Sequence, residues 1–376
     1  MLIIYKWEES NMSKIIKTFL LVPFITLFSY AASSDVTVAS WGGAYTESQI
    51  KAYVDTYDAA TVKFENYNGG LGEVRAQVES GAVVWDVVDV LPDQAITGCD
   101  EGLFEDISDE YENFIPAPDG TDMIADMANS GVTNLSDCCA PQIFWSYVVF
   151  YDPTNFPGAK PQTMADFYDT EKFPGKRGIH TWAQANIEMA LTADGVDPTQ
   201  VYNILSNQTG AVDRAFDKLD TIKDDIVFWS AGSKPLELVK SGEVSMALAY
   251  NGRVGAAILS EGENFEYMWH GQVLEQEYIC LTAGSPNRDE ALAWMIHASS
   301  PESQALQAKY IPYGPMRASG IDLIKAGEPF FHTGVNIMPH MPNTPARLEI
   351  STVGDPVWWS DNGAEINERF SAWMGS

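Results

Sequence analysis

Basic residues are scarce in this chain. Its 376 residues include 22 Lys and Arg but 52 Asp and Glu, which gives a formal net charge of −30. Nucleic-acid binding depends on basic side chains that neutralise phosphates, so the composition excludes that class of partner. The negative field favours a cationic or zwitterionic partner, and a solubility adaptation to salty surroundings explains the same charge equally well.

Motifs of catalysis and metal binding are also lacking. The five histidines form no H-E-x-x-H pair, and the chain contains neither a G-x-S-x-G turn nor a G-x-x-x-x-G-K-[ST] phosphate loop. Cys138 and Cys139 are adjacent and lack the C-x-x-C spacing of zinc sites. We therefore expect no enzyme, no cofactor and no metal.

A run long enough for a membrane span is missing, since the apolar stretch Thr18–Phe28 falls short of the ~20 residues needed. Two lysines precede it and small residues follow, a pattern that predicts a secretory signal peptide over residues 1–31, cleaved after Ala31. Glu8 and Glu9 are unusual ahead of such a peptide, so Met12 is an alternative start. The remaining 345 residues, with 45% hydrophobic residues in the whole chain, suggest two packed domains.

Cysteines number only four, and the first is Cys99, so no lipid-attachment cysteine stands at the cleavage point. A soluble exported protein of this kind indicates a Gram-negative periplasm. In that oxidising compartment Cys99 is expected to pair with Cys138 or Cys139. Cys280 lies in an apolar run and is expected to be a buried free thiol.

Strands and helices alternate in the first third of the chain. Strands are predicted at Val36–Ser40, Val62–Tyr67 and Trp85–Val90, with helices at Thr46–Tyr57, at Leu71–Ser80 and after Pro92. Such alternation is typical of a parallel α/β sheet, in which ligands bind beyond the carboxyl ends of the strands. The side chains expected at those ends are Trp41, Tyr45, Tyr67 and Asp93.

The aromatic run Phe144–Tyr151 predicts a strand that crosses to a second domain. A second α/β series follows, with strands at Arg177–His180, Ile226–Trp229 and Val244–Ala249 and helices at Met164–Tyr168, Ala183–Ala193, Val212–Ile222 and Pro235–Ser241. A return crossing is expected at Phe265–Met268 and Glu277–Leu281, and then helices at Asp289–Ser299 and Pro301–Ala308. The predicted lobes are residues 32–145 plus 270–312, and 146–269 plus 313–376.

Between Arg75 and Lys160 there is no basic residue, whereas Asp and Glu number sixteen. Most of these acids are expected to form a solvated face, and one or two to contact a ligand.

Aromatic residues near the predicted strand ends and crossings are the best candidates for a binding site, because ring faces attract cations. These residues are Trp41, Tyr45, Trp182, Trp229, Tyr250, Trp269 and Tyr278. Filling of the core explains each of them equally well, and Trp85, directly before a strand, is expected to be structural.

Several short motifs, taken in order, resemble the spermidine/putrescine-binding branch of the periplasmic solute-binding proteins of ABC transporters. They are Ser40-Trp41-Gly42-Gly43-Ala44-Tyr45, Asn68-Gly69-Gly70, Trp85-Asp86-Val87-Val88-Asp89, Gly98-Cys99-Asp100-Glu101-Gly102-Leu103, Phe173-Pro174-Gly175-Lys176-Arg177-Gly178, Tyr250-Asn251-Gly252 and Tyr310-Ile311-Pro312-Tyr313-Gly314-Pro315. The resemblance implies a two-lobed α/β fold of the periplasmic binding protein type with parallel or mixed sheets and crossing hinge strands. It also implies closure on a ligand, delivery to an inner-membrane permease and a Cys99–Cys138 disulfide.

The resemblance further implies ligand contacts by Trp41, Tyr45, Tyr250 and Glu277. Two departures stand out. Thr181, Trp182 and Gln184 replace acids that polyamine binders carry, and Arg253 replaces an acidic or small residue. A guanidinium disfavours a dication but can hold a carboxylate, unless Arg253 points into its own lobe and pairs with an acid there.

The predicted function is therefore capture of a polyamine by a monomeric binding protein. A betaine-like zwitterion is the alternative, and a secreted enzyme is third. The predicted ligand-binding residues are Trp41, Tyr45, Asp93, Trp182, Trp229, Tyr250, Arg253, Glu277 and Tyr313.

Overall fold

The computed structural model describes residues 35–131, 134–324 and 327–376. The predicted signal peptide and its cleavage point after Ala31 lie outside these residues. Among the described helices, none is both long and apolar enough to cross a membrane.

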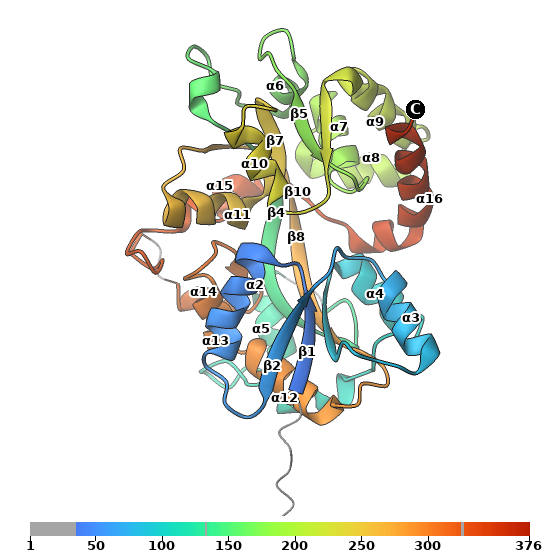
Figure 1. The fold of residues 1–376 in the computed structure, drawn as a ribbon, viewed down its shortest axis with the longest axis vertical. Helices are drawn as coiled ribbons and strands as arrows, with labels where there is room; N and C mark the ends of the chain where they lie inside the picture. Colours follow the sequence, from blue (N-terminus) through green and yellow to red (C-terminus); the bar gives the residue numbers. More distant parts are fainter. Residues whose placement is uncertain (1–34, 132–133, 325–326) are drawn as a thin grey trace, which may run out of the picture. The chain divides into compact units, whose positions relative to one another are not determined.

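Ten strands of the described chain form one mixed sheet, with two long strands through its middle (Figure 1). The long strands, β4 (Cys139–Tyr151) and β8 (Glu266–Leu281), pair antiparallel. Every residue of β4 is buried, which agrees with its largely apolar and aromatic sequence. The other strands are β1 (Asp35–Ser40), β2 (Thr61–Asn66), β3 (Val87–Val90), β5 (Arg177–His180), β6 (Ile226–Trp229), β7 (Met246–Tyr250), β9 (Gly314–Pro315) and β10 (Thr352–Val353).

Each long strand carries a group of parallel strands. In the first strand group, β1 lies between β2 and β3, and β3 joins β8 antiparallel. In the second strand group, β5 lies between β6 and β7, and β7 joins β4 antiparallel. The predicted α/β fold with crossing strands is thus confirmed, and the two expected sheets join through β8 and β4 into one.

Helices flank both strand groups (Figure 1). They are α2 (Gly43–Gln49), α3 (Gly72–Ser80), α4 (Pro92–Asp100), α5 (Met123–Asn129), α6 (Met164–Tyr168), α7 (Asn186–Ala193), α8 (Val201–Asn207), α9 (Ala211–Asp220), α10 (Lys234–Lys240), α11 (Asn251–Ala256), α12 (Arg288–Ala298), α13 (Pro301–Gln307), α14 (Ala318–Asp322), α15 (Pro345–Leu348) and α16 (Pro356–Met374). The sequence patterns missed α16. It begins at the Asp355 cap, which accepts from Trp358 N at 3.0 Å, and buries Trp359 and Phe370.

Two separate hydrophobic cores accompany the two strand groups. Val38 and Val88 of the first group pack in a core with Trp294 of α12, whereas Ile179 and Leu248 of the second group belong to the other core. Separate cores are the physical basis of two lobes, because each can fold around its own apolar centre. The lobe boundaries given above stay a prediction.

Several element ends differ from the sequence-based ranges. The helix predicted from Thr46 begins at Gly43, and the Thr46 hydroxyl instead accepts from Gly42 N at 2.9 Å. The helix predicted from Ala183 begins at Asn186, because Ala185 has φ +67° and interrupts the helical conformation. The two segments of the return crossing are the ends of the single strand β8.

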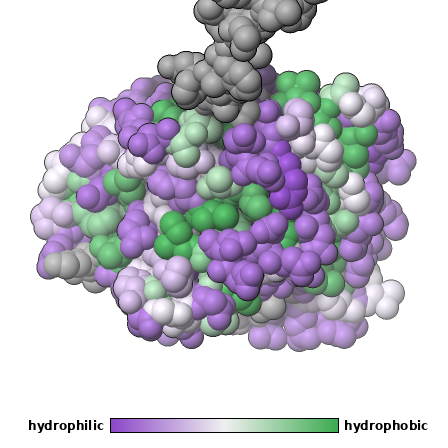
Figure 2. Space-filling model, turned by 90° about the horizontal axis from the view of Figure 1, so that it is seen from below, coloured by the Kyte–Doolittle hydropathy of each residue, from purple (hydrophilic) through white to green (hydrophobic). Residues whose placement is uncertain are grey.

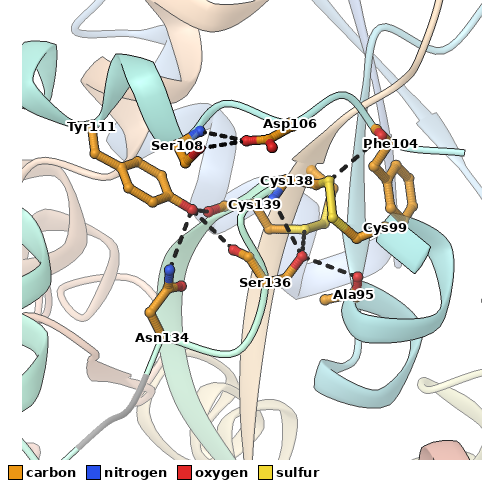
Figure 3. The surroundings of a disulfide bond; sticks show 11 residues. Ala95, Cys99, Phe104, Asp106, Ser108, Tyr111, Asn134, Ser136, Cys138 and Cys139 are labelled. Atoms are coloured by element: carbon orange, nitrogen blue, oxygen red, sulfur yellow. Dashed lines mark hydrogen bonds between the residues drawn. A yellow bond between two sulfur atoms is a disulfide. The ribbon is translucent and has the colours of Figure 1, made fainter. Parts of the chain in front are cut away.

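Both cysteine pairs are oxidised, and Figure 3 shows the Cys99–Cys138 bond with its surroundings. The Cys99–Cys138 disulfide implied by the family resemblance is confirmed. The predicted free thiol of Cys280 is wrong, because Cys280 lies directly opposite Cys139 in the β4–β8 pairing and is bonded to it. Direct cross-strand neighbours lie close enough for their side chains to bond, and the pairing could not be read from the sequence.

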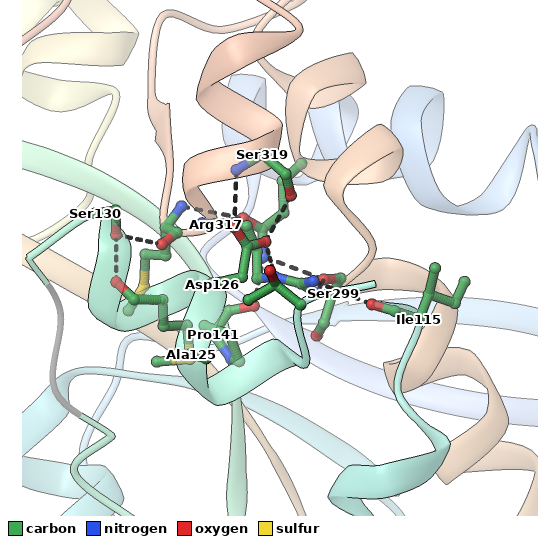
Figure 4. A network of polar contacts seen from close by, with 12 residues as sticks. Ile115, Ala125, Asp126, Ser130, Pro141, Ser299, Arg317 and Ser319 are labelled. Atoms are coloured by element: carbon green, nitrogen blue, oxygen red, sulfur yellow. Dashed lines mark hydrogen bonds and ion pairs between the residues drawn. The ribbon is translucent and has the colours of Figure 1, made fainter. Parts of the chain in front are cut away.

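Most of the sixteen acids between Arg75 and Lys160 are exposed, as expected. Seen from the α12 end in Figure 2, hydrophilic side chains make up much of the surface around smaller groups of hydrophobic ones. Asp126 is an exception, since it is buried and accepts from Arg317 Nε at 2.6 Å (Figure 4). Arg317 also donates to the carbonyls of Ser299 and Ile115, so this pair joins several segments.

Candidate ligand-binding site

A pocket that encloses about 560 Å³, counted with the open solvent at its mouth, is lined by the loops that follow β1, β2 and β3, by residues at the ends of the second strand group, and by both long strands. Its lining consists of Trp41, Tyr45, Tyr67, Asn68, Leu91, Ile143, Trp145, Tyr147, His180, Trp182, Ser230, Gly232, Tyr250, Arg253, Glu277 and Tyr313.

One face of the central strands forms the floor of this pocket. Side chains alternate between the two faces of a strand, so Ile143, Trp145 and Tyr147 of β4 share a face. Glu277 of β8 pairs directly with Ile143, and Tyr250 of β7 pairs directly with Tyr147. The strand register therefore gathers these five residues on one surface, and all five line the pocket.

An aromatic wall stands on the loops beyond β1, β2 and β5. The Trp41 ring stacks on Tyr67 at 4.9 Å and meets Trp182 edge-on at 6.3 Å. The close approach of the Trp41 and Trp182 rings to the backbone requires a glycine at position 69. It has φ +80°, and an added Cβ would lie 2.6 Å from both tryptophan rings.

Glu277 is the carboxylate that lines the pocket. It is 3% exposed, and its Oε1 accepts from Trp41 Nε1 at 2.6 Å. Burial, followed by the nearby charge of Asp89, holds the pKa of Glu277 well above its usual range. A cation placed beside it would favour the ionised form.

Arg253 reaches the same pocket from α11. Its Nη2 donates to the carbonyls of Trp41 at 3.1 Å and Gly42 at 3.0 Å, and its guanidinium lies 5.8 Å from the Tyr250 ring centre. It is 6% exposed, and no carboxylate in the described part of the chain pairs with it. The alternative that Arg253 pairs with an acid of its own lobe is therefore not observed in the described part of the chain.

His180, the last residue of β5, orders the aromatic side chains. Its Nδ1 accepts from Trp182 N at 2.9 Å, and its ring contacts those of Trp229 at 4.4 Å and Trp182 at 4.8 Å. Burial lowers the pKa of His180 to about 3, so the imidazole is neutral at physiological pH. It thus positions rings and adds no charge to the pocket.

Tyr45 and Tyr313 complete the lining, with ring centres 5.9 Å apart. Tyr45 Oη donates to Gln142 Oε1 at 2.6 Å. The Tyr313 ring lies against Gly252, where an added Cβ would come within 2.3 Å of it. Packing against Tyr313 accounts for the glycine of the Tyr250-Asn251-Gly252 motif.

Seven of the nine predicted site residues line the pocket, namely Trp41, Tyr45, Trp182, Tyr250, Arg253, Glu277 and Tyr313. Asp93 and Trp229 do not. Trp229 lies behind the lining against His180 and Tyr250. Asp93 is in the first turn of α4, and burial raises its pKa to about 6. Two further candidates lie elsewhere, because Trp269 stacks on Tyr267 and Tyr278 is buried in the core of the first strand group.

Sequence reasoning missed several lining residues. The alternation Phe144-Trp145-Ser146-Tyr147 could have marked Trp145 and Tyr147 as sharing a face. Ser230 follows β6 and His180 ends β5, so both stand at carboxyl ends of parallel strands, where ligands are expected. At Leu91 and Ile143, nothing in the sequence distinguishes a residue that lines the pocket from one that fills the hydrophobic core.

The departures from the polyamine pattern are explained in part. Gln184 does not line the pocket and donates to Glu275 Oε1 at 3.0 Å. Trp182 lines it, whereas Thr181 pairs its backbone N–H with the Trp229 carbonyl. Within the described residues, no group of His, Cys, Asp and Glu side chains is arranged to hold a metal ion.

Comparison with known proteins gives the family. Residues 48–330 match the family described as bacterial extracellular solute-binding protein. The gamma-aminobutyric acid-binding protein of Pseudomonas aeruginosa is 36% identical over 346 residues, which cover 91% of this chain and 92% of the relative.

Solved structures agree. AgtB of Agrobacterium tumefaciens in complex with agropinic acid is 25% identical with a TM-score of 0.77, over 91% of this chain and 99% of that one. A GABA receptor is 29% identical with a TM-score of 0.71, over 91% and 98%. These relatives bind solutes, which supports the expectation that this protein is no enzyme, while the narrower spermidine/putrescine branch stays a prediction. The chain belongs to the bacterial extracellular solute-binding protein family.

Proposed function

We propose that this protein is the periplasmic substrate-binding component of an ABC transporter and captures a small zwitterion of the 4-aminobutyrate (GABA) class. The ligand carries a protonated amine at one end and a carboxylate at the other. The protein is exported by its N-terminal signal peptide, works as a monomer and delivers the ligand to an inner-membrane permease. The family match and a relative named for GABA binding support this proposal.

Arg253 is the observation that carries it. A buried guanidinium without a carboxylate partner is costly, and here its known acceptors are two backbone carbonyls. A ligand carboxylate would supply the missing anion through charge-assisted hydrogen bonds. Since Arg253 lines the pocket beside Tyr250, the carboxylate end of the ligand belongs there.

The amine end belongs at Glu277. Its carboxylate accepts from Trp41 Nε1 and shares the pocket lining with Trp145 and Tyr250, and the faces of such rings attract a cation. A primary ammonium can also donate hydrogen bonds to Glu277, and the quaternary nitrogen of a betaine cannot. The site therefore favours an amino acid over a betaine.

A polyamine fits this lining less well. Two ammonium groups call for two carboxylates, and among the described lining residues Glu277 is the carboxylate present. The same lining contains Arg253, which repels the second ammonium. Polyamine binding, the first prediction from the sequence, is thus the competing outcome of the test.

Isothermal titration of the purified processed chain with GABA, putrescine and glycine betaine tests the proposal. GABA should bind at least tenfold more tightly than the other two. Tighter binding of putrescine would overturn the zwitterion assignment, and absence of binding by all three would overturn the ligand class as a whole. A thermal shift with each compound provides an independent readout, since a ligand at 100 times its Kd stabilises a protein by ~2.7 kcal/mol.

A further inference from the structure

Two buried carboxyl groups lie side by side beneath the amine end of the pocket. Asp89 of β3 pairs directly with Ile279 of β8, so Glu277, two residues earlier on β8, is its diagonal neighbour on the same face. Diagonal neighbours lie within reach of long side chains. Asp89 is 0% exposed and Glu277 is 3% exposed.

Hydrogen bonds from neutral groups hold this pair. Gln49 Nε2 donates to both oxygens of Asp89, at 2.9 and 3.1 Å, and Trp41 donates to Glu277. Gln49 is fixed in turn, because its Oε1 accepts from Ser40 Oγ at 2.6 Å. In the described part of the chain, neither carboxyl has a Lys, Arg or His partner.

Two adjacent buried carboxylates without a cation cannot both stay charged at low cost, since burial and mutual repulsion act in the same direction. We propose that Glu277 and Asp89 share one proton while the pocket is empty and that a ligand ammonium expels it. Asp89 would thereby act through Glu277 as a positioning residue that restricts the site to cationic amines. This inference rests on the proposed function for the identity of the ligand.

The proton balance is simple. The shared proton passes from the carboxyl pair to water and buffer, while the ammonium keeps its own three protons. Two ionised carboxylates and one ammonium carry a net charge of −1, which is also the charge of the carboxyl pair with its shared proton, so exchange of the proton for the ammonium leaves the local charge unchanged.

Other ionisable groups lie around the pair. They are Tyr45, Tyr53, Tyr67, Tyr250, Tyr313 and Glu275, with Arg253 in the same lining. Burial raises the pKa of each of these tyrosines, so all five stay neutral up to pH 9. Burial also raises the pKa of Asp89 to about 7 and holds the pKa values of Glu277 and Glu275 well above their usual range, so these carboxyls keep protons at pH values where exposed carboxyls are ionised.

Calorimetry in buffers of different ionisation enthalpy measures the exchange directly. GABA is titrated into the processed chain at pH 7 in phosphate, HEPES and Tris, and the slope of binding enthalpy against buffer enthalpy gives the protons released. We expect about one proton per ligand, with affinity that rises about tenfold per pH unit below the titration of the pair and levels off above it. GABA binding with a slope of zero would overturn the inference and leave the proposed function intact.

Two variants separate Asp89 from a general effect of buried charge. Asp89→Asn removes the like charge, so fewer protons should be released at pH 7 and the rise of affinity should move to lower pH. Glu275→Gln is the matched control, because Glu275 lies two residues from Glu277 on the same face, is equally buried, and is absent from the lining. An Asp89→Asn profile identical to the wild type, or an equal change in both variants, would refute the role of Asp89.

If Asp89→Asn does not fold, the slope of binding enthalpy against buffer enthalpy for the wild-type protein still tests whether a proton is released. If putrescine binds in place of GABA and releases the proton, the inference stands and the zwitterion assignment fails. If neither amine binds, both proposals fall.

Discussion

Replacing Arg253 with alanine is the sharpest perturbation of the proposed carboxylate site. The change removes the pocket's guanidinium together with its hydrogen bonds to the Trp41 and Gly42 carbonyls. A bound GABA would then keep its carboxylate in a desolvated pocket without a partner.

The expected magnitude follows from that loss. Truncation of one partner of a buried charged pair costs about 2–5 kcal/mol, which weakens binding roughly 30- to 4000-fold. Arg253→Lys keeps the charge but loses the planar two-point geometry, so its Kd should fall between the wild type and the alanine variant. Binding of putrescine should be unchanged or improved, because a repelling charge is gone.

Calorimetry of each variant with GABA and putrescine provides the measurement, and circular dichroism establishes that the variants are folded. Arg347→Ala is the matched control. Arg347 is also a partly buried arginine bonded to backbone carbonyls, with Trp269 under its guanidinium at 3.8 Å, and it lies outside the pocket lining. A folded Arg253→Ala protein with wild-type affinity for GABA would refute the carboxylate assignment.

Three more predictions concern packing, charge and cross-links. Gly69→Ala should raise the Kd for GABA roughly tenfold more than Gly70→Ala, because both glycines have positive φ but only Gly69 is pressed against the tryptophan rings. Equal effects on Kd in the two variants would mean that backbone strain, and not contact with the tryptophan rings, weakens binding. Glu277→Gln should raise the melting temperature of the unliganded protein at pH 8, with a gain that shrinks toward pH 5. The raised pKa of Glu277 contributes stability at low pH that is lost as pH rises from about 4.5 through the raised value, so a flat difference across this range would contradict the burial argument. The double change Cys139→Ser and Cys280→Ser should lower the free energy of unfolding by about 2–5 kcal/mol with little change in GABA affinity, as measured by urea unfolding and calorimetry, and an unchanged stability would show that the cross-link is dispensable.

The sequence supported prediction of the fold because its strands and helices alternate with clear ends. Trp41 and Tyr250 were found for that reason, since each stands at the carboxyl end of a strand. Trp229 met the same criterion and lies one layer behind the lining. The position of a residue along a strand predicts that it lies at the ligand-binding end of the sheet. The orientation of its ring depends on neighbours such as His180, which come from other segments.

Pairings between distant segments were the part that local patterns could not supply. The Cys139–Cys280 bond depends on strands that are 141 residues apart in sequence. The antiparallel pairing of β3 with β8 makes Asp89 the diagonal neighbour of Glu277, and this pairing could not be read from the sequence for the same reason. Period-2 patterns show which face a residue occupies, but they do not show which residue of another strand lies opposite.

Net charge is a poor guide to the ligand for a related reason. The formal charge of −30 favours cations near the surface, yet charges in solution are screened over about 8 Å at physiological ionic strength. Inside the pocket, burial leaves the nearest ionisable groups in control, and these include Arg253 as well as Glu277. The acidic surface can thus speed the approach of an ammonium group. The proposed choice of a zwitterion over a dication depends instead on one guanidinium, and a single arginine is not apparent from the net charge.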